Sequence, residues 1–248
     1  MMTVILCVNR STPFLEAAIR SVLDQDDDDF DFLIGANACD DALIEEIEGV
    51  VAGDSRVRVV RSGVPQLAYN LNSLVDMAQT EWVMRMDADD VSESTRISCF
   101  RAVMARTDAD VIGSWATLID GHDCEIGLFK PEASHERIRR AFPFRNQICH
   151  PAVAFRKSYW LEMRGYLGGF VSEDFDLWLR GFAAGKRFAN IPQPLLRYRI
   201  HGEQASRSRR GYAEAAAHWY RELLIRPSWF NLVGCIVATG KVLIKGRR

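Results

Sequence analysis

Three acidic residues within four positions are the feature of the sequence best suited to bind a cation. Asp87, Asp89 and Asp90 come directly after the apolar run at 82–86. If the chain stays extended there, Asp87 and Asp89 leave the same side of it and Asp90 points the other way. Carboxylate oxygens are preferred ligands of Mg²⁺ and Mn²⁺, which can neutralise charge on a leaving phosphate group. The pattern predicts a metal site at Asp87 and Asp89; an alternative is that Asp90 or Ser92 only caps the next helix.

A second acidic group stands at the start of a predicted helix. On a helical wheel Asp174 shares its face with apolar residues further along, so we expect it to point inward. Asp176 lies four residues before Arg180, the spacing of a solvated ion pair. The helix dipole keeps an inward first-turn carboxylate ionised while burial raises its pKa, and a general base needs this balance. The alternative is that Asp174 is a plain capping acid.

Apolar patterns predict the elements that position these residues. Buried strands are predicted at 4–8, 30–36, 57–60 and 82–86. Helical spacing predicts a helix after each strand, the first with Thr12 as its N-cap and Pro13 in its first turn. This alternation predicts an α/β fold with a parallel sheet, in which ligands bind beyond the carboxyl ends of the strands. Asn37, at the end of the second strand, should therefore lie near the acidic cluster.

The second half of the chain has a different pattern. Runs at 113–119 and 124–129 flank Asp120-Gly121 and predict a hairpin. Further strands are predicted at 151–155, near Phe188 and at 195–200, with a helix from Glu173 between them. This half is expected to be α+β structure beside the parallel sheet.

Composition and missing motifs narrow the classes of function. A net charge of −2 gives no reason to expect nucleic acid as a partner. The six cysteines are dispersed and form no CxxC pair, which favours reduced thiols and a cytoplasmic location, and no signal-peptide pattern is visible. No GxGxxG follows a predicted strand, which argues against a dinucleotide-dependent dehydrogenase. The segment 8–11 is not a Gly-rich phosphate loop, which disfavours a nucleotidyltransferase.

Four stretches in order resemble the family 2 glycosyltransferases, which have the GT-A fold. They are 4–23 (VILCVNRSTPFLEAAIRSVL), 30–41 (FDFLIGANACDD), 82–90 (WVMRMDADD) and 172–180 (SEDFDLWLR). Segments 150–153 (HPAV) and 196–201 (LRYRIH) resemble later landmarks of that family, so the resemblance covers about 3–206. An ordered set of this kind is far more specific than any one motif.

The resemblance implies both a fold and a reaction. The fold would be a Rossmann-like, mainly parallel sheet flanked by helices, with the nucleotide-sugar half at about 1–115 and the acceptor half at about 116–206. A helical tail would follow at 207–248. The reaction would be metal-dependent inverting transfer of a sugar, from a UDP-sugar by preference, to a hydroxyl of a saccharide or lipid-linked acceptor. Such enzymes use Mn²⁺ or Mg²⁺ and serve the synthesis of bacterial surface polysaccharides.

The resemblance also assigns residues. Asp87 and Asp89 match the metal and nucleotide motif, with Asp89 expected to contact the metal directly, and Asp174 matches the catalytic base. Asn37 stands where the family often has an Asp that binds the nucleotide base. Arg85 and Arg199 could pair with the diphosphate, because a guanidinium fork suits phosphate oxygens; for Arg197 a surface ion pair is favoured. Further candidates are Val8, Asn9 and Asn72 for the donor and His201 for the metal; Trp178 is expected in the core.

Two departures from the family weaken the identification of the nucleotide. Residues 7–10 (CVNR) replace a frequent Pro-x-Tyr-Asn and remove the usual aromatic neighbour of the base, and Ala36-Asn37 replaces Asp-Asp. An amide still donates to and accepts from a pyrimidine edge, so uridine remains the first choice. A nucleotide-sugar binding protein without turnover, or a nucleotidyltransferase of related architecture, is the alternative function.

The C-terminal segment 229–244 is almost entirely apolar or small and is too short to span a membrane. Apolar residues recur at helical spacing, and basic residues stand on both sides. One interpretation is a helix that lies on the anionic inner face of the plasma membrane, with peripheral contact through 229–248. The other is a terminal helix that packs on the domain or on a partner subunit.

Overall fold

The structure, a computed structural model, describes residues 1–169, 171–200 and 209–245. The four predicted strands of the first half form in it and run parallel. They are β1 (Met2–Val8), β2 (Phe30–Asn37), β3 (Val57–Ser62) and β4 (Trp82–Asp87). Their order in the sheet is β3-β2-β1-β4, and Cys7 pairs with both Gly35 and Asp87. The carboxyl ends of the three central strands therefore meet at one edge, as predicted.

Beyond β4 the sheet is mixed. β8 (Val153–Arg156) lies antiparallel to β4, followed by β6 (Val111–Ile119), β9 (Phe188–Arg199) and β5 (Val91–Ser92). β7 (Glu125–Phe129) pairs antiparallel with β6, which confirms the predicted hairpin. The strands predicted near Phe188 and at 195–200 are one strand, whose register against β6 shifts where Trp115 faces Pro194. Proline lacks the N–H that a regular ladder needs, so the pairing is interrupted there without ending the strand.

Helices cover both faces of the sheet, because alternate strand residues point to opposite sides. One core joins Val4 and Leu6 to α1 (Leu15–Leu23), α2 (Asp41–Val51) and α4 (Arg96–Met104). The other joins Ile5 to α3 (Leu67–Met77), α5 (His135–Ala141), α6 (Lys157–Glu162) and α7 (Glu173–Ala183). Trp178 is fully buried in this second core, as predicted. A short 3-10 helix, η1 (His150–Ala152), precedes β8.

The start of α1 differs from the prediction. The helix begins at Leu15, and Thr12 is not its N-cap: the Thr12 carbonyl accepts a hydrogen bond from the Leu15 amide at 3.1 Å. Residues 13 and 14 form a turn before the helix. This turn places 9–14 beside the carboxyl end of β4, where they line a cavity described below.

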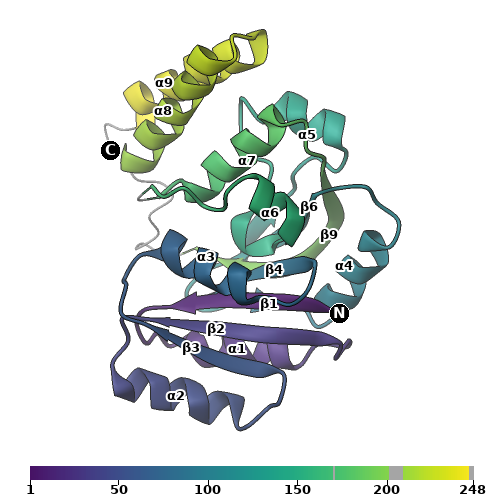
Figure 1. Ribbon diagram of the computed structural model, residues 1–248, viewed down its shortest axis with the longest axis vertical. Helices are drawn as coiled ribbons and strands as arrows, with labels where there is room; N and C mark the ends of the chain where they lie inside the picture. Colours follow the sequence, from purple (N-terminus) through teal and green to yellow (C-terminus); the bar gives the residue numbers. More distant parts are fainter. Residues whose placement is uncertain (170, 201–208, 246–248) are drawn as a thin grey trace.

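Two helices, α8 (Arg209–Ile225) and α9 (Trp229–Lys245), form the tail and pack on each other at the end of the molecule farthest from α2 (Figure 1). Their inner faces belong to the core around α7. The Phe230 ring lies 5.2 Å from the Trp219 ring, and a side chain at Gly234 would overlap Trp219. The tail thus packs on the domain through this face. Among the described residues, no helix is long and apolar enough to cross a membrane.

Candidate active site

A cavity of about 540 Å³ opens at the carboxyl edge of the parallel strands. Its walls are residues 7–14, after β1, and residues 87–89, after β4. The predicted donor-binding residues Val8 and Asn9 therefore face the same space as the two predicted metal ligands. This volume is within the usual range for small-molecule sites.

The three carboxylates of the acidic cluster converge. One oxygen each of Asp87, Asp89 and Asp90 lies within 4.8 Å of the others. Asp90 is buried; its Oδ1 accepts a hydrogen bond from the Arg199 amide at 2.8 Å, while its Oδ2 has no hydrogen-bond partner among the described residues. Burial, reinforced by the charges of Asp87 and Asp89, raises the Asp90 pKa well above its usual value. A divalent cation would relieve this repulsion, so these residues fit Mn²⁺ or Mg²⁺.

The alternative of a helix cap at this position is wrong. α4 begins at Arg96, several residues beyond Asp90. The Ile97 amide of its first turn donates instead to the side chain of Gln25 at 3.0 Å. Ser92 lies in β5, where its hydroxyl accepts a hydrogen bond from the Gln25 amide at 3.2 Å. Because the side chain of Gln25, which follows α1, accepts this first-turn hydrogen bond, neither Asp90 nor Ser92 caps α4.

Arg199 holds the acidic loop through contacts within the chain, and its role as a phosphate ligand stays a prediction. Its Nε donates to the Asp89 carbonyl at 2.7 Å and its Nη1 to the Asp120 carbonyl at 2.9 Å. Its Nη2 pairs with Asp123 Oδ1 at 2.8 Å, and the guanidinium lies over the Phe14 ring at 4.0 Å. The planar guanidinium group of Arg199 thus links the Asp89 backbone to the turn between β6 and β7 and to Phe14, which lines the cavity.

Arg85 keeps its predicted position beside the metal motif. Its Nη2 lies 2.5 Å from Asp87 Oδ1. The side chain is buried, and its Nε and Nη1 have no hydrogen-bond partner among the described residues. Unsatisfied buried N–H groups are costly, and an anionic ligand would satisfy them. Arg96, which the sequence analysis missed, donates to the Arg85 carbonyl and to the Pro151 carbonyl, each at 2.8 Å. These two hydrogen bonds join β4 to η1.

The two asparagine predictions have different outcomes. Asn37 is buried at the end of β2, and its Oδ1 has no hydrogen-bond partner in the described part of the chain. It is not among the residues that line the cavity. Asn72 does not line it either: its side chain donates to the Tyr166 carbonyl at 2.8 Å and accepts from the Tyr166 amide and from Trp160. These hydrogen bonds hold the segment after α6 against α3, and the spacing of residues in the sequence could not predict them. A contact between Asn72 and the donor stays a prediction.

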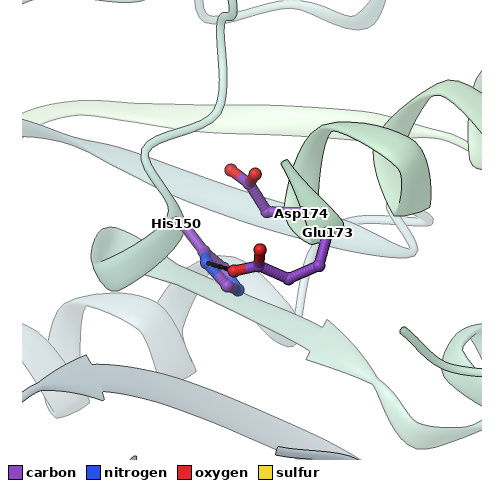
Figure 2. A group of neighbouring side chains, drawn as sticks. All are labelled: His150, Glu173 and Asp174. Atoms are coloured by element: carbon purple, nitrogen blue, oxygen red, sulfur yellow. Dashed lines mark ion pairs between the residues drawn. The ribbon is translucent and has the colours of Figure 1, made fainter. Parts of the chain in front are cut away.

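The start of α7 brings a second group of titratable side chains together (Figure 2). His150 Nδ1 lies 4.0 Å from Glu173 Oε1, and His150 Nε2 lies 2.9 Å from Tyr166 Oη. Burial, with the charge of Arg85, lowers the His150 pKa well below its usual value, so this imidazole is neutral. Burial and then the charge of Glu173 raise the pKa of Asp174 to about 7. Asp174 therefore has a pKa suited to a general base.

The helical wheel was wrong about the exposure of Asp176. Asp176, predicted to be solvated, is 1% exposed. It pairs with Arg180 Nε at 2.8 Å, as its spacing predicted, and also with Arg221 Nη1 at 2.5 Å. Asp174 is half-buried and lines a cavity between α7 and the tail. The wheel failed because α8 covers the side of α7 that was expected to face solvent.

The remaining candidate residues are Arg197, His201 and His150. Arg197 donates a hydrogen bond to the Asp123 carbonyl at 2.9 Å; this partner is a backbone group, so the favoured surface ion pair stays a prediction. His201 lies outside the described residues. His150, which the sequence analysis quoted only as a family landmark, is part of the cluster at Glu173. Its only signal in the sequence was its place in the HPAV segment.

Comparisons with known sequences agree with this geometry. Residues 3–163 match Glycosyl transferase family 2. Over 251 residues the chain is 34% identical to the O-antigen biosynthesis glycosyltransferase WbnJ of Escherichia coli, covering 99% of this chain and 97% of that protein. Over 163 residues it is 32% identical to the Escherichia coli UDP-Gal:alpha-D-GlcNAc-diphosphoundecaprenol beta-1,3-galactosyltransferase, covering 62% of this chain and 58% of that protein.

Solved structures show the same architecture. S. aureus TarS 1–349 in complex with UDP-GlcNAc superimposes with a TM-score of 0.71 at 13% identity, over 98% of this chain and 81% of that one. The mannosyltransferase PcManGT of Pyrobaculum calidifontis, in complex with GDP-Man and Mn²⁺, gives 0.72 at 15% identity, over 98% and 70%. At such identities the similarity establishes the fold alone. The family match and the WbnJ similarity establish the rest: the chain belongs to Glycosyl transferase family 2 and is a glycosyltransferase with a GT-A fold.

Proposed function

We propose that this glycosyltransferase moves a sugar from a nucleotide-diphosphate sugar, UDP-linked by preference, to a hydroxyl of a lipid-linked saccharide during synthesis of a surface polysaccharide. One observation carries the proposal: Asp87 and Asp89 line one cavity, and Asp87 pairs with a buried Arg85 whose Nε and Nη1 have no hydrogen-bond partner among the described residues. The relatives' names, which refer to O-antigen and to a diphosphoundecaprenol acceptor, support the substrate class.

On the donor side, Asp87 and Asp89 would hold Mn²⁺ or Mg²⁺. When bound, the cation neutralises charge that grows on the leaving diphosphate. Arg85 adds a buried charge beside Asp87, and its Nε and Nη1, which have no partner among the described residues, would be available to phosphate oxygens. Arg199 holds the Asp89 backbone and the Phe14 ring in place. Val8, Asn9 and the buried Asn37 amide are the candidates for contacts with the nucleoside.

On the acceptor side, Asp174 would take the proton of the attacking hydroxyl. Its raised pKa makes it a stronger base than an ordinary aspartate, while about half of it remains ionised at pH 7. The oxygen then bonds to the anomeric carbon as the bond to the diphosphate breaks. Attack on the side opposite to the diphosphate inverts the anomeric centre in one displacement.

The donor site is tested by calorimetry of UDP and GDP binding, each with and without Mn²⁺. We expect Mn²⁺-dependent UDP binding in the wild type that Asp89→Ala abolishes. Asp76→Ala is the matched control, because Asp76 is an exposed aspartate of α3 remote from the cavity. If neither nucleotide binds in any condition, the proposed donor class is wrong. Binding without turnover would instead support the alternative of a nucleotide-sugar binding protein.

We also propose that the tail contacts the inner face of the plasma membrane, which places the enzyme in the cytoplasm at the site of lipid-linked acceptors. Trp229, Ile236 and Leu243 follow one another at seven-residue intervals on the outer face of α9 and are 82%, 63% and 62% exposed. Leu224 and Ile225, at the end of α8, are exposed as well. An exposed apolar stripe of this kind on a helix that cannot span the bilayer suits interfacial binding.

Membrane contact is tested with anionic liposomes. Removal of α9 would uncover Trp219, so we would replace only exposed side chains: Trp229→Ser with Ile236→Ser and Leu243→Ser. The control replaces Ile126 and Leu161 by Ser, which are exposed apolar residues outside the tail. We expect the tail variant to lose cosedimentation and the control to keep it. Equal partitioning of both variants and the wild type would contradict the proposal.

A further inference from the structure

The first turn of α7, which carries the proposed base Asp174, is not capped by its own N-cap residue. Ser172 stands at that position, where a serine side chain usually accepts a hydrogen bond from an amide of the first turn. Here the Ser172 side chain makes no such bond. Ser172 is buried, and its hydroxyl donates instead to Glu214 Oε2 of α8 at 2.9 Å. The N-cap side chain is therefore directed to the tail rather than to its own helix.

The same oxygen of Glu214 also holds the backbone that leads into α7. It accepts hydrogen bonds from the Val171 amide at 3.1 Å and from the Ser172 amide at 3.2 Å. One carboxylate oxygen thus accepts three hydrogen bonds from two consecutive residues that lie 43 and 42 positions away in the sequence. Hydrogen bonds to a charged acceptor are about twice as strong as those between neutral groups. Glu214 is therefore an anchor for the residues directly before the first turn of α7.

A second residue of α8 contacts the same hydroxyl group. His218 follows Glu214 by about one helical turn, so both side chains leave the same face of α8. Its Nε2 lies 3.1 Å from Ser172 Oγ, and its Nδ1 lies 3.6 Å from Asp176 Oδ1. The start of α7 is thus held by α8 at several points, and Glu214 is the point that reaches the residues before the proposed base.

This arrangement leaves the first-turn amides of α7 to Asp174. An N-cap side chain would bond to the amide of the second or third helical residue, which here are Asp174 and Phe175. Burial and the charge of Glu173 raise the pKa of Asp174, and hydrogen bonds from these two amides to its carboxylate oppose the rise. If Ser172 were released from Glu214, its hydroxyl would compete with the Asp174 carboxylate for the same amides.

We propose that Glu214 is a positioning residue for the base: by holding the backbone and the hydroxyl of Ser172, it fixes the Asp174 carboxylate and keeps the first-turn amides directed to it. The proposal rests on the proposed function, in which Asp174 accepts the proton of the attacking hydroxyl. It gives the tail a task in turnover that is separate from membrane contact, because Glu214 faces α7 and not the exposed stripe of α9. Glu214 does not line the donor cavity, so nucleotide binding should not depend on it.

Three substitutions separate position from charge. Glu214→Leu removes the acceptor, Glu214→Gln keeps an oxygen at the same reach without the charge, and Glu214→Asp keeps the charge on a shorter side chain. The charge needs its own variant because, after burial, it contributes to the raised pKa of Glu173. The matched control is Glu222→Leu, which removes a buried glutamate of the same helix that pairs with Arg221.

Turnover is measured on the full chain as UDP release from UDP-galactose, UDP-glucose or UDP-GlcNAc, with octyl α-GlcNAc-diphosphate as the acceptor probe. Each kcat is divided by the number of Mn²⁺-dependent UDP sites found by calorimetry, so that loss of folded protein does not count as loss of kcat. We expect kcat per UDP site to fall at least about 10-fold in Glu214→Leu and at least about 5-fold in Glu214→Asp, because a shift of about 1 Å costs up to about 10²-fold. Glu214→Gln and Glu222→Leu should stay within about 2-fold, as should the UDP affinity of every variant.

Wild-type kcat in Glu214→Leu, with Asp174→Asn inactive, overturns this inference and leaves the proposed function in place. An equal loss in Glu222→Leu also overturns it, because the effect would then come from packing of the tail. So does an active Glu214→Asp with an inactive Glu214→Gln, since charge and not position would be responsible; this contrast decides even if Glu214→Leu does not fold. An active Asp174→Asn, or no turnover by the wild type with any of the three donors, would be a failure of the proposed function itself, and the inference falls with it.

Discussion

Two acidic clusters in this chain look alike in sequence and differ in what surrounds them. In the loop after β4, the carboxylates of Asp87, Asp89 and Asp90 converge on an open cavity. In the first turn of α7 only Asp176 is held apart, by two arginines, whereas Asp174 stays beside Glu173 and has no salt bridge among the described residues. Burial alone therefore does not predict the role of a carboxylate here.

This difference indicates that the cationic partners of a carboxylate, rather than its burial, decide which role the carboxylate has in this chain. Asp176 has two guanidinium groups at hydrogen-bond distance and is more buried than Asp174. Asp174 has burial and the neighbouring charge of Glu173, and both raise its pKa. In the loop, Asp87 pairs with Arg85, and the burial of Asp90 beside Asp87 and Asp89 raises the Asp90 pKa, a repulsion that a metal ion can relieve. The predictions below test this division.

The largest effect is expected for Asp174→Asn. Removal of the proton acceptor should reduce transfer by about 10²–10⁴-fold, the usual contribution of general base catalysis. Mn²⁺-dependent UDP binding should stay within about 2-fold of the wild type, because Asp174 lines the other cavity. Transfer is measured by release of UDP in the presence of acceptor. A variant that keeps more than about a tenth of the activity would remove Asp174 from the role of base.

The same carboxyl group predicts the pH dependence of transfer. Below its pKa of about 7, Asp174 is protonated and cannot accept a proton, so kcat/KM for the acceptor should rise about tenfold per pH unit and level off above pH 7. UDP affinity at each pH is the control, since the pKa of Asp90 in the loop is also raised. A profile that is flat from pH 5 to 8 would contradict the assignment.

Linkage gives this pKa a consequence for stability. The folded-state pKa of Asp174 lies above the value of about 3.9 expected in the unfolded chain, so folding favours the protonated form. Its contribution to the free energy of unfolding is complete below about pH 4 and is lost as the pH rises through about 7. Asp174→Asn, which stays neutral, should therefore gain stability relative to the wild type between pH 4 and pH 8. Thermal unfolding of both proteins across this range measures the difference.

In the loop, Arg199→Lys should weaken UDP binding in the presence of Mn²⁺ by about 10-fold. An ammonium group cannot reach the Asp89 carbonyl, the Asp120 carbonyl and Asp123 together as the guanidinium does. The β6–β7 turn and the acidic loop would then lose their common anchor. Arg197→Lys is the matched control on the same strand, because within the described part of the chain the Arg197 side chain donates one hydrogen bond, to the Asp123 carbonyl. If both variants lower UDP affinity equally, Arg199 has no special positioning role.

The sequence predicted the donor half better than the acceptor half, for a physical reason. Strand ends in a parallel sheet meet at one edge, so Val8, Asn9, Asp87 and Asp89 could be brought together from strand positions alone. Local spacing also identified the hairpin and the i,i+4 pair of Asp176 with Arg180. These features depend either on residues that are close in sequence or on the rule that the carboxyl ends of parallel strands meet at one edge of the sheet.

The failures involve contacts between distant segments. Asn72 bonds to Tyr166, Arg199 bonds to the Asp120 carbonyl, and Asp176 is covered by Arg221 of α8. No periodicity in one element specifies which other element will cover it. The cavity between α7 and the tail, formed by segments more than 90 residues apart, was for the same reason not predicted from the sequence.

The smallest effect on turnover is expected for Asp176→Asn, and this variant tests the comparison most directly. The change is the same as at Asp174, two residues along the same helix, but it removes the partner of Arg180 and Arg221. Loss of one member of a buried ion pair costs about 3–5 kcal/mol; since Arg221 is 35% exposed and Asn can still accept a hydrogen bond, we expect less, about 1–3 kcal/mol of unfolding free energy. Transfer per folded molecule should stay within about 3-fold of the wild type, because Asp176 does not line the cavity between α7 and the tail. Urea unfolding gives the first quantity and UDP release at 15 °C the second. If Asp176→Asn loses as much activity as Asp174→Asn without loss of stability, ion pairing does not separate the two carboxylates, and the base would have to be assigned anew.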